Sequence, residues 1–356
     1  RQDGKVEKYK CRLAAQGFWQ VNGVYYTEKY QPTPATTPIR IVLVTAAAKD
    51  GELCHFDAEQ AFLKADIDGE LYIEIPEEYQ KFPGAVGRLN KAICELVQAG
   101  KCWNNKFCGD MAAIGFGQGK ADPCVFRKVV DGEVEVVVVV HVDDILAHAK
   151  DKVTIDRFAA ELGQKFKLKQ WGRLLCAVAS FCKNPGPAHK KEVMNYFLRT
   201  KDWEITYGGQ GCGLCMEAYM DSDFGACLDT KRSVSGAVLM LTKGAISWYS
   251  AIQEVTASGT SEAEYVALSE AVKDILFSRQ VKKFMEPSMG VGAVNVFEDN
   301  EGAIKLATIK HASRRTKHID VKHHMVRDTS DAQKVKVVYV RSIDQHADLL
   351  TKPFDK

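Results

Sequence analysis

Three aspartates in the first half of the chain stand where short apolar runs stop. Asp57 follows the run ELCHF, and Asp143 and Asp144 interrupt a series of β-branched residues that resumes at Ile145. Phosphoryl transfer to a nucleotide needs two divalent ions about 4 Å apart, and Mg²⁺ prefers carboxylate oxygens as ligands. Acidic residues are also common in turns, but two adjacent charges inside a Val/Ile sheet are costly when nothing pairs with them. The spacing therefore favours a two-metal site over an ordinary acidic turn.

Carboxylates in the second half are spaced so that they can meet at one edge of a sheet. Two are expected at or just past strand ends and two on helices packed over that edge: Asp221, Asp299, Glu264 and Asp348. Such a set suits two-metal hydrolysis of a phosphodiester. Each residue alone is weak evidence, because Glu264 has capping-box spacing from Ser261 and Asp348 could be a solvated helix residue.

Apolar patterning predicts the elements that would position the first set. The β-branched runs 134–142 and 145–149 predict a β-hairpin that carries Asp143 and Asp144 at its tip. The other elements expected in this half are a helix over 39–48, a strand over 52–56, a turn or short helix over AEQAFLKADI, a strand over 70–75 and a helix over 91–114.

A glycine-rich stretch, GGQGCG at 208–213, marks the strongest boundary in the chain. After it, strands alternate with helices in an α/β layout, and the helix at 261–285 has the clearest apolar stripe. The predicted strands cover 214–220, 233–241, 245–250, 294–297 and 334–340, and the predicted helices cover 261–285, 301–307 and 344–350.

Length and composition indicate a soluble globular chain. Its 356 residues fit two domains, and 46% apolar with 26% charged residues leaves enough aliphatic mass for real cores. The longest aliphatic run, 136–140, is far shorter than the roughly 20 residues of a spanning helix. The absence of an initiator Met and of an apolar leader predicts an intracellular fragment or a piece of a longer polyprotein, cytoplasmic or nuclear. A formal charge of +2 excludes a histone-like polycation.

Eleven stretches spread over the chain carry a further signal: YKCRLAAQGF, TTPIRIVLVTAAA, FDAEQAFLKADIDGELYIEIPEEY, HVDDILAHAK, KFKLKQWG, NPGPAHKKEVMNYFLRTKDWEITYG, YMDSDFGACLDTKRSVSGAVLMLTKGAISWYS, TSEAEYVALSEAVKD, VFEDNEGAIKLA, RTKHIDVKHHMVRD and HADLLTKPF. In order and spacing they resemble, over nearly the whole chain, the reverse transcriptase and ribonuclease H region of copia-type LTR-retrotransposon polyproteins. The resemblance implies an α/β and α+β fold: reverse-transcriptase palm and fingers, followed by a ribonuclease H-like α/β domain. The implied domains are fingers and palm at 1–168, a shortened thumb or connection remnant at 169–207 and the ribonuclease H-like domain at 208–356.

The same resemblance assigns roles to individual residues. It makes Asp57, Asp143 and Asp144 the polymerase metal ligands, and it assigns the ribonuclease ligands to Asp221, Glu264, Asp299 and Asp348. Each active site would use two Mg²⁺ ions, with Mn²⁺ as a substitute. Phe62 occupies the position that lies under the nucleotide sugar, although a core role is a close rival. Lys10 and Arg12 match cations that meet the triphosphate, although a basic strand edge explains them equally well.

Several departures from the family pattern fall in the polymerase half. His141 stands where the family usually has Tyr, ICELVQ at 93–98 replaces a motif resembling YGLKQ, and Gln16 replaces a common Lys. The connection from Gly172 to Pro185 is much shorter than in the family. These departures indicate a decayed or internally deleted element whose ribonuclease half keeps all its motifs.

Basic residues and histidines alternate over 310–327 (KHASRRTKHIDVKHHMVR). Such a surface would neutralise phosphates of a nucleic acid, with Arg314, Arg315, Lys317 and His318 as candidate contacts, and a solvated loop is the alternative. Neither this stretch nor the pair Cys212 and Cys215 has the further ligands that a structural zinc site needs.

Two functions of different classes follow. The first is an RNA-directed DNA polymerase with ribonuclease H activity, whose partners would be an RNA template, a DNA primer, an RNA–DNA hybrid, dNTPs and other polyprotein products, with no membrane partner. The second is a catalytically inactive nucleic-acid-binding remnant of a retrotransposon.

Overall fold

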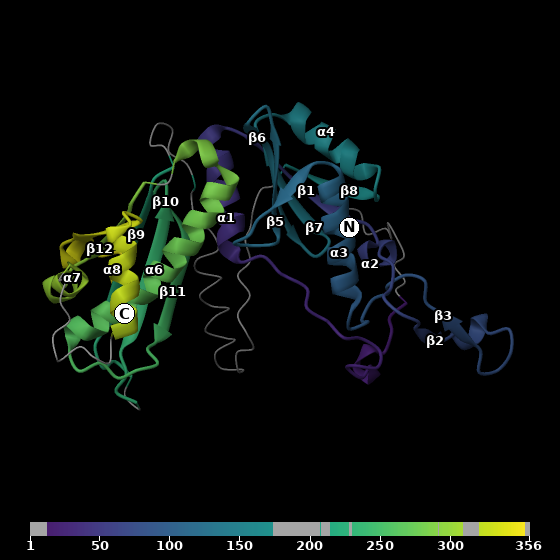
Figure 1. Cartoon of the computed structure of the whole chain (residues 1–356), viewed down its shortest axis with the longest axis horizontal. Helices are drawn as coiled ribbons and strands as arrows, with labels where there is room; N and C mark the ends of the chain where they lie inside the picture. Colours follow the sequence, from purple (N-terminus) through teal and green to yellow (C-terminus); the bar gives the residue numbers. More distant parts are fainter. Residues whose placement is uncertain are drawn as a thin grey trace, which may run out of the picture. The chain divides into compact units, whose positions relative to one another are not determined.

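The computed structural model describes residues 13–173, 207, 214–227, 230–290, 292–308 and 320–352. Contacts divide the chain into two compact units (Figure 1). The first contains Arg1–Ala35 and Glu52–Arg173, and the second contains Thr36–Gly51 and Leu174–Lys356. The predicted boundaries at 168 and 208 stay a prediction.

The first unit is built on a six-stranded sheet. Its order is β4-β5-β6-β7-β1-β8, and every neighbouring pair is antiparallel. The strands are β1 (Glu52–Ala58), β4 (Phe116–Gln118), β5 (Val125–Val130), β6 (Glu133–His141), β7 (Asp144–Ala149) and β8 (Leu168–Arg173). The predicted hairpin is confirmed, because β6 pairs with β7 from Val136↔Ala149 to His141↔Asp144. A separate two-stranded sheet joins β2 (Tyr72–Glu74) and β3 (Val86–Arg88).

Helices and aromatic rings complete the core of this unit. The helices are α2 (Ala61–Lys64), α3 (Ala99–Ala113) and α4 (Lys152–Gly163). Trp103 on α3 packs against Phe107 and Phe166, with ring centroids 5.7 and 5.4 Å away. Asp151 caps α4, since its side chain accepts a hydrogen bond from the Thr154 amide.

The predicted helix over 91–114 is wrong in its first third, because α3 begins at Ala99. The preceding backbone bonds elsewhere: the Ala92 amide donates to the Ala65 carbonyl, and the Ala15 amide donates to the Cys94 carbonyl. Glu95 also has a φ of 66°, which is incompatible with a right-handed helix.

The hairpin turn contains a strained residue. Val142 has a φ of 60°, in the left-handed region that β-branched side chains disfavour. Its carbonyl accepts a hydrogen bond of 2.6 Å from the Trp103 indole nitrogen. Trp103 is 1% exposed, so the core of the unit fixes the turn that carries Asp143 and Asp144.

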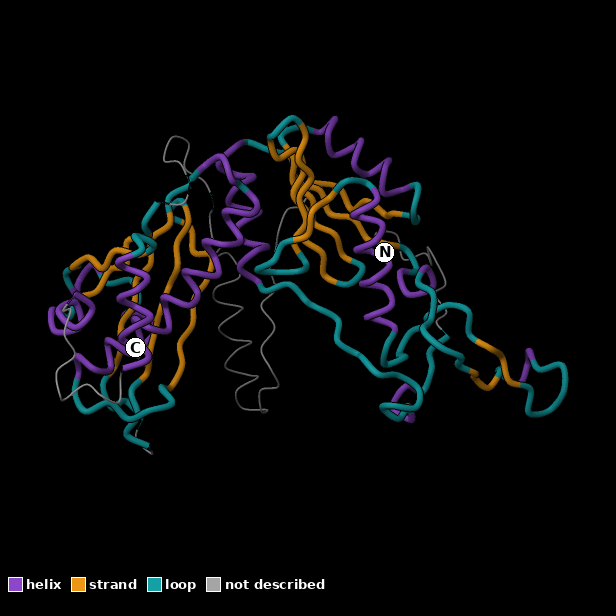
Figure 2. Tube along the Cα trace, viewed as in Figure 1, coloured by secondary structure: helices purple, strands orange, loops and turns teal. Residues whose placement is uncertain are grey.

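The second unit contains a five-stranded mixed sheet in the order β11-β10-β9-β12-β13. The pairs β11·β10 and β10·β9 are antiparallel, whereas β9·β12 and β12·β13 are parallel. The strands are β9 (Met216–Asp223), β10 (Val234–Leu241), β11 (Gly244–Ile252), β12 (Val294–Glu298) and β13 (Val335–Tyr339). Figure 2 shows the long helix α6 (Thr260–Met285) running along this sheet, with α7 (Glu301–Thr308) and α8 (Asp320–Asp331) beside it.

Two sequence predictions for helix ends in this unit are wrong. The expected helix over 344–350 is a 3₁₀ turn, η5 (Ser342–Asp344), and one turn of helix, α9 (Asp348–Thr351). The expected capping box of Ser261 and Glu264 is absent, because α6 starts before Ser261. Instead, the Glu262 carboxylate accepts a hydrogen bond from the Ser258 amide, while Glu264 lies inside the unit.

Helix α1 (Thr36–Lys49) packs in the second unit, although the segments Arg1–Ala35 and Glu52–Arg173 on either side of residues 36–51 belong to the first. The Arg40 guanidinium lies 3.8 Å from the centroid of the Trp248 ring, and its Nη1 donates to the Ile246 carbonyl at 3.1 Å. Lys49 pairs with Glu286 at the end of α6. Ile41, Val42, Val44 and Ala46 are each at most 2% exposed, which explains why the middle of this helix is apolar.

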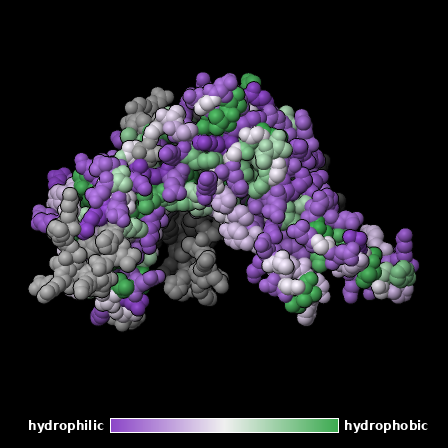
Figure 3. Space-filling model, in the orientation of Figure 1, coloured by the Kyte–Doolittle hydropathy of each residue, from purple (hydrophilic) through white to green (hydrophobic). Residues whose placement is uncertain are grey.

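The visible face of the molecule is mostly hydrophilic, with apolar residues in small separate groups (Figure 3). Among the described residues, no helix combines the length and the apolar character that crossing a bilayer requires.

The Trp103→Phe variant tests how the hairpin turn is held. Phenylalanine retains an aromatic ring but leaves the carbonyl of half-buried Val142 without its donor, so we expect a loss of about 0.5–1.5 kcal/mol of stability. Urea unfolding followed by circular dichroism measures it, with exposed Trp19→Phe as the control. Equal midpoints for the two variants would show that this hydrogen bond does not stabilise the turn.

Candidate functional sites

The acidic residues of the first unit gather at the tip of the β6–β7 hairpin. Asp57 on β1 lies directly opposite Asp144 on β7 in the antiparallel ladder. The Ala58 amide donates to the Asp143 carbonyl at 2.9 Å, which places Asp143 beside the same strand end. Burial raises the pKa of Asp143, with smaller contributions from the charges of Asp144 and Asp57.

A histidine pairs with one of these carboxylates. His55 Nε2 lies 2.9 Å from Asp144 Oδ1, and both side chains are accessible to solvent. Asp57, Asp143 and Asp144 do not form a group with ligand atoms within 4.8 Å of one another, in contrast to carboxylates of the second unit. His141 is exposed at the end of β6. Phe62 packs partly buried against the core, as its core alternative expects, and its role under the sugar stays a prediction.

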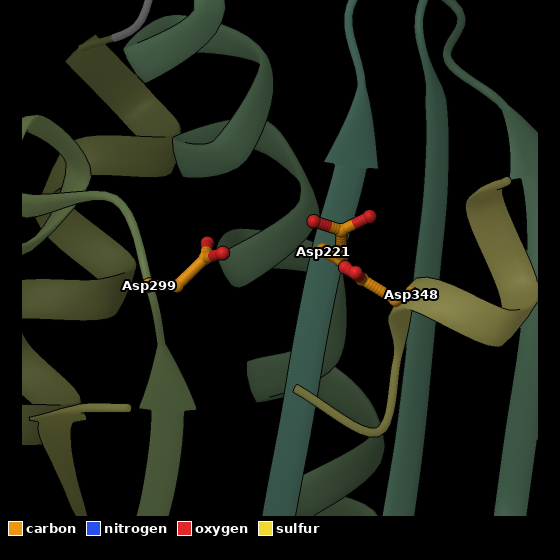
Figure 4. A group of neighbouring side chains, drawn as sticks. All are labelled: Asp221, Asp299 and Asp348. Atoms are coloured by element: carbon orange, nitrogen blue, oxygen red, sulfur yellow. The ribbon is translucent and has the colours of Figure 1, made fainter. Parts of the chain in front are cut away.

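In the second unit, three aspartates from separate elements converge (Figure 4). Asp221 lies on β9, Asp299 directly follows β12 and Asp348 begins α9, and each offers an oxygen within 4.8 Å of the others. Thr351 donates a hydrogen bond to Asp221 Oδ2. Lys352 Nζ lies 2.8 Å from Asp348 Oδ1 and 3.9 Å from Asp221 Oδ1, so an ammonium group offsets part of the charge.

A second acidic group adjoins the first and shares Asp299 with it. Oxygens of Glu264 on α6, Glu298 on β12 and Asp299 also lie within 4.8 Å of one another. Burial, together with the neighbouring carboxylates, raises the pKa of Glu264 to about 9 and that of Glu298 to about 8. Their Oε2 atoms are buried without any hydrogen-bond partner.

A glycine allows α9 to approach the sheet closely. Gly236 on β10 lies opposite Asp221, and a Cβ atom there would stand 2.8 Å from side-chain atoms of Leu350 and Thr351. Because only hydrogen occupies this position, α9 packs directly on the strand beside Asp221. The close contact brings Asp348 to the acidic edge.

The residues of this edge fit a divalent cation. Carboxylate oxygens are the ligands that Mg²⁺ and Mn²⁺ prefer, and buried unpartnered oxygens are costly unless a proton or a cation satisfies them. Glu264 Oε2 and Glu298 Oε2 are such atoms. Each predicted ribonuclease carboxylate thus belongs to one of two adjoining groups.

Some predicted site residues lie outside the described residues, and four residues at the two sites were not predicted from the sequence. Lys10, Arg12, Arg314, Arg315, Lys317 and His318 lie outside the described residues, and their roles stay predictions. The residues that were missed are His55, Glu298, Thr351 and Lys352. Of these, Glu298 had a sequence signal: it continues the alternation of Val294 and Val296 onto the same buried face.

Comparisons with known proteins agree with this architecture. The family model described as "Reverse transcriptase (RNA-dependent DNA polymerase)" matches residues 1–179. The chain is 27% identical over 446 aligned residues to "Retrovirus-related Pol polyprotein from transposon TNT 1-94" of Nicotiana tabacum, across 98% of the chain and 33% of that protein. It is 24% identical over 441 residues to the Pol polyprotein from transposon RE2 of Arabidopsis thaliana, across 99% of the chain and 30% of that protein. The chain spans about a third of the length of these relatives.

Solved structures also align with the chain. The ribonuclease H domain of rv2228c from Mycobacterium tuberculosis aligns with 39% of this chain and 91% of its own, at 13% identity and a TM-score of 0.29. The foamy viral protease-reverse transcriptase in complex with double-stranded DNA aligns with 85% of this chain and 59% of its own, at 8% identity and a TM-score of 0.44.

The antiparallel sheet with its acidic hairpin, together with the matching family model, defines a protein of the reverse transcriptase class. The chain belongs to the reverse transcriptase (RNA-dependent DNA polymerase) family, and its full-length relatives are copia-type Pol polyproteins of plant transposons. The expected fold class, α/β and α+β, is confirmed.

The Gly236→Ala variant tests how Asp348 is positioned. The new methyl group would push α9 off the sheet and cost about 1–3 kcal/mol by overpacking. We expect lower thermal stability and weaker Mn²⁺ binding, because Asp348 moves away from Asp221. Gly292→Ala is the control, since no atom lies within 4 Å of a Cβ there. Equal Mn²⁺ affinity in both variants would contradict this role of Gly236.

The raised pKa values of Glu264 and Glu298 predict how stability depends on pH. Both folded pKa values exceed the ordinary value of 4.5, so the folded chain retains protons that the unfolded chain releases. Stability is therefore greatest below the unfolded pKa and declines as pH rises toward about 9. We expect the melting temperature in EDTA to fall between about pH 6 and pH 9, and the fall to be shallower in Glu264→Gln. A parallel decline in parent and variant would rule out this cause.

Proposed function

We propose that the chain is an RNA-directed DNA polymerase joined to a ribonuclease H, in which the hydrolytic half is competent and the polymerase half is impaired. One observation supports the hydrolytic half above all: Asp221, Glu264, Asp299 and Asp348 meet at one edge of the mixed sheet. Two divalent cations bound there would supply an activated water and stabilise the charge that develops on the phosphodiester.

The chain's own residues would prepare this site. Asp221 is 3% exposed on a central strand, so its position is fixed by packing. Thr351 orients the Asp221 carboxylate, and Lys352 reduces repulsion between Asp221 and Asp348. The substrate would be the RNA strand of an RNA–DNA hybrid, with the basic stretch 310–327 neutralising backbone phosphates. Arg314, Arg315, Lys317 and His318 are proposed phosphate contacts on sequence grounds alone.

Impairment of the polymerase half is proposed from the departures at His141, at 93–98 and in the shortened segment after Gly172. The alignment with the tobacco relative supports a deletion, because it spans 446 positions and the chain has only 356 residues. Asp57, Asp143 and Asp144 are the proposed polymerase metal ligands, while Lys10, Arg12 and Phe62 are the proposed nucleotide contacts. A nucleic-acid-binding remnant is the second candidate, favoured by the same departures.

Two assays on one sample of the full chain test these functions. In Mg²⁺, we expect cleavage of the RNA strand of a hybrid, and a loss of at least about a hundredfold in Asp299→Asn because a neutral amide is a poor ligand for a hard cation. Asp328→Asn, an exposed change on α8, is the matched control. Primer extension should be weak or absent, and any extension should be lost in Asp143→Asn but kept in Asp131→Asn.

The results separate the two candidates. Hybrid binding without cleavage would favour the remnant. Processive extension without cleavage would overturn the proposed division of function between the two units.

A further inference from the structure

Glu298 occupies a position where a strand ordinarily buries an apolar side chain. It is the last residue of β12, and the residues that precede it on the same face, Val294 and Val296, are 1% and 0% exposed. Glu298 is itself 0% exposed. Burial of an ionised carboxylate is expensive unless a hydrogen bond, a proton or a cation compensates for it. The carboxylate of Glu298 therefore requires a hydrogen-bond donor, a proton or a cation beside it.

The hydrogen bonds of Glu298 satisfy only half of its carboxylate. Oε1 accepts a hydrogen bond of 2.8 Å from the Asn300 amide, while Oε2 is buried without a partner. Glu264, which is 6% exposed, also has a buried Oε2 without a partner. Together with an oxygen of Asp299, these two side chains offer ligand atoms within 4.8 Å of one another. Two buried, unsatisfied oxygens thus belong to one small acidic group.

The Lys352 ammonium compensates the two acidic groups unequally, because it pairs with Asp348 and acts on Asp299 of the inner group only through a smaller electrostatic interaction. Lys352 pairs with Asp348 and lies near Asp221, on the side of the edge formed by β9 and α9. Within the described part of the chain, no lysine or arginine forms an ion pair with Glu264, Glu298 or Asp299. Glu298 and Glu264 therefore face each other between α6 and the sheet, and no described lysine or arginine forms an ion pair with either.

We propose that Glu298 is a ligand of the divalent cation held by Glu264 and Asp299, so that the hydrolytic site contains a fifth carboxylate. This inference rests on the proposed two-metal function and adds to it a ligand that the family pattern does not supply. The charges then balance: five carboxylates face two divalent cations and the Lys352 ammonium. A shared proton on an otherwise structural pair of glutamates is the competing explanation.

Mn²⁺ binding to the full chain distinguishes the two explanations, because it can be counted by electron paramagnetic resonance without any substrate. In Glu298→Gln we expect the affinity of one class of Mn²⁺ site to fall at least about tenfold, since an amide oxygen replaces a charged ligand. The sites held by Asp221 with Asp348 and by the hairpin aspartates should keep their affinity. Asp348→Asn should instead weaken the site that Asp348 helps to hold, and Glu301→Gln, an exposed change on α7, should alter no site.

Thermal melting provides a second readout that a structural role would not reproduce. In EDTA, Glu298→Gln should melt at the same or a higher temperature than the parent, because it removes one of two facing carboxylates. Its gain in melting temperature on adding Mg²⁺ should be smaller than the parent's.

The outcomes separate this inference from the proposed function. Unchanged Mn²⁺ affinity and an unchanged Mg²⁺ gain in Glu298→Gln would overturn the inference and leave hybrid cleavage untouched. A lower melting temperature in EDTA with a full Mg²⁺ gain would assign Glu298 to the core alone and also overturn it. If the parent chain bound no Mn²⁺, both the inference and the two-metal function would fail.

Discussion

Repulsion between like charges at the acidic edge of the mixed sheet is the constraint on which the second unit depends. Parallel pairing of β9 with β12 brings Asp221 and Asp299 to the same edge, and α9 adds Asp348. Neighbouring groups reduce the free-energy cost of this repulsion. Thr351 donates a hydrogen bond to Asp221, Lys352 pairs with Asp348, and the Asn300 amide donates a hydrogen bond to Glu298. The fold concentrates carboxylates in a region of low dielectric constant, where the attraction between a cation and a carboxylate is strong.

The two acidic sites differ in how much the surrounding protein confines them. At the hairpin tip, Asp144 is open to solvent and paired with His55, and the rigidity comes from the Trp103 hydrogen bond to the turn. In the second unit, Glu264 and Glu298 are shut between a helix and a sheet. A solvated site tolerates empty coordination positions because water fills them, whereas a buried one does not. The hairpin site is therefore stable without a bound cation, because water can satisfy its carboxylates.

Local patterns predicted most of the elements, since runs such as 134–142 and the stripe of α6 depend mainly on their own residues. The carboxylates at strand ends, such as Asp57 and Asp221, were predicted because the ends of apolar runs are visible in the local sequence. The sequence could not reveal long-range partners: the start of α3 depends on hydrogen bonds to Ala65 and Ala15, and Glu264 faces Glu298 between α6 and the sheet instead of capping the helix, which begins before Ser261. Glu298 was missed because the predicted strand ended one residue early, although its alternation with Val296 was visible.

The position of α1 means that the second unit is discontinuous along the chain. Residues 52–173 form an insertion between α1 and the rest of that unit, so α1 emerges from the ribosome long before the sheet on which it packs exists. Until β11 and α6 are synthesised, the apolar faces of α1 have no native partner and need protection from aggregation. A protease that cut between residues 52 and 173 would break the chain but leave α1 held by Arg40, Trp248 and the Lys49–Glu286 pair.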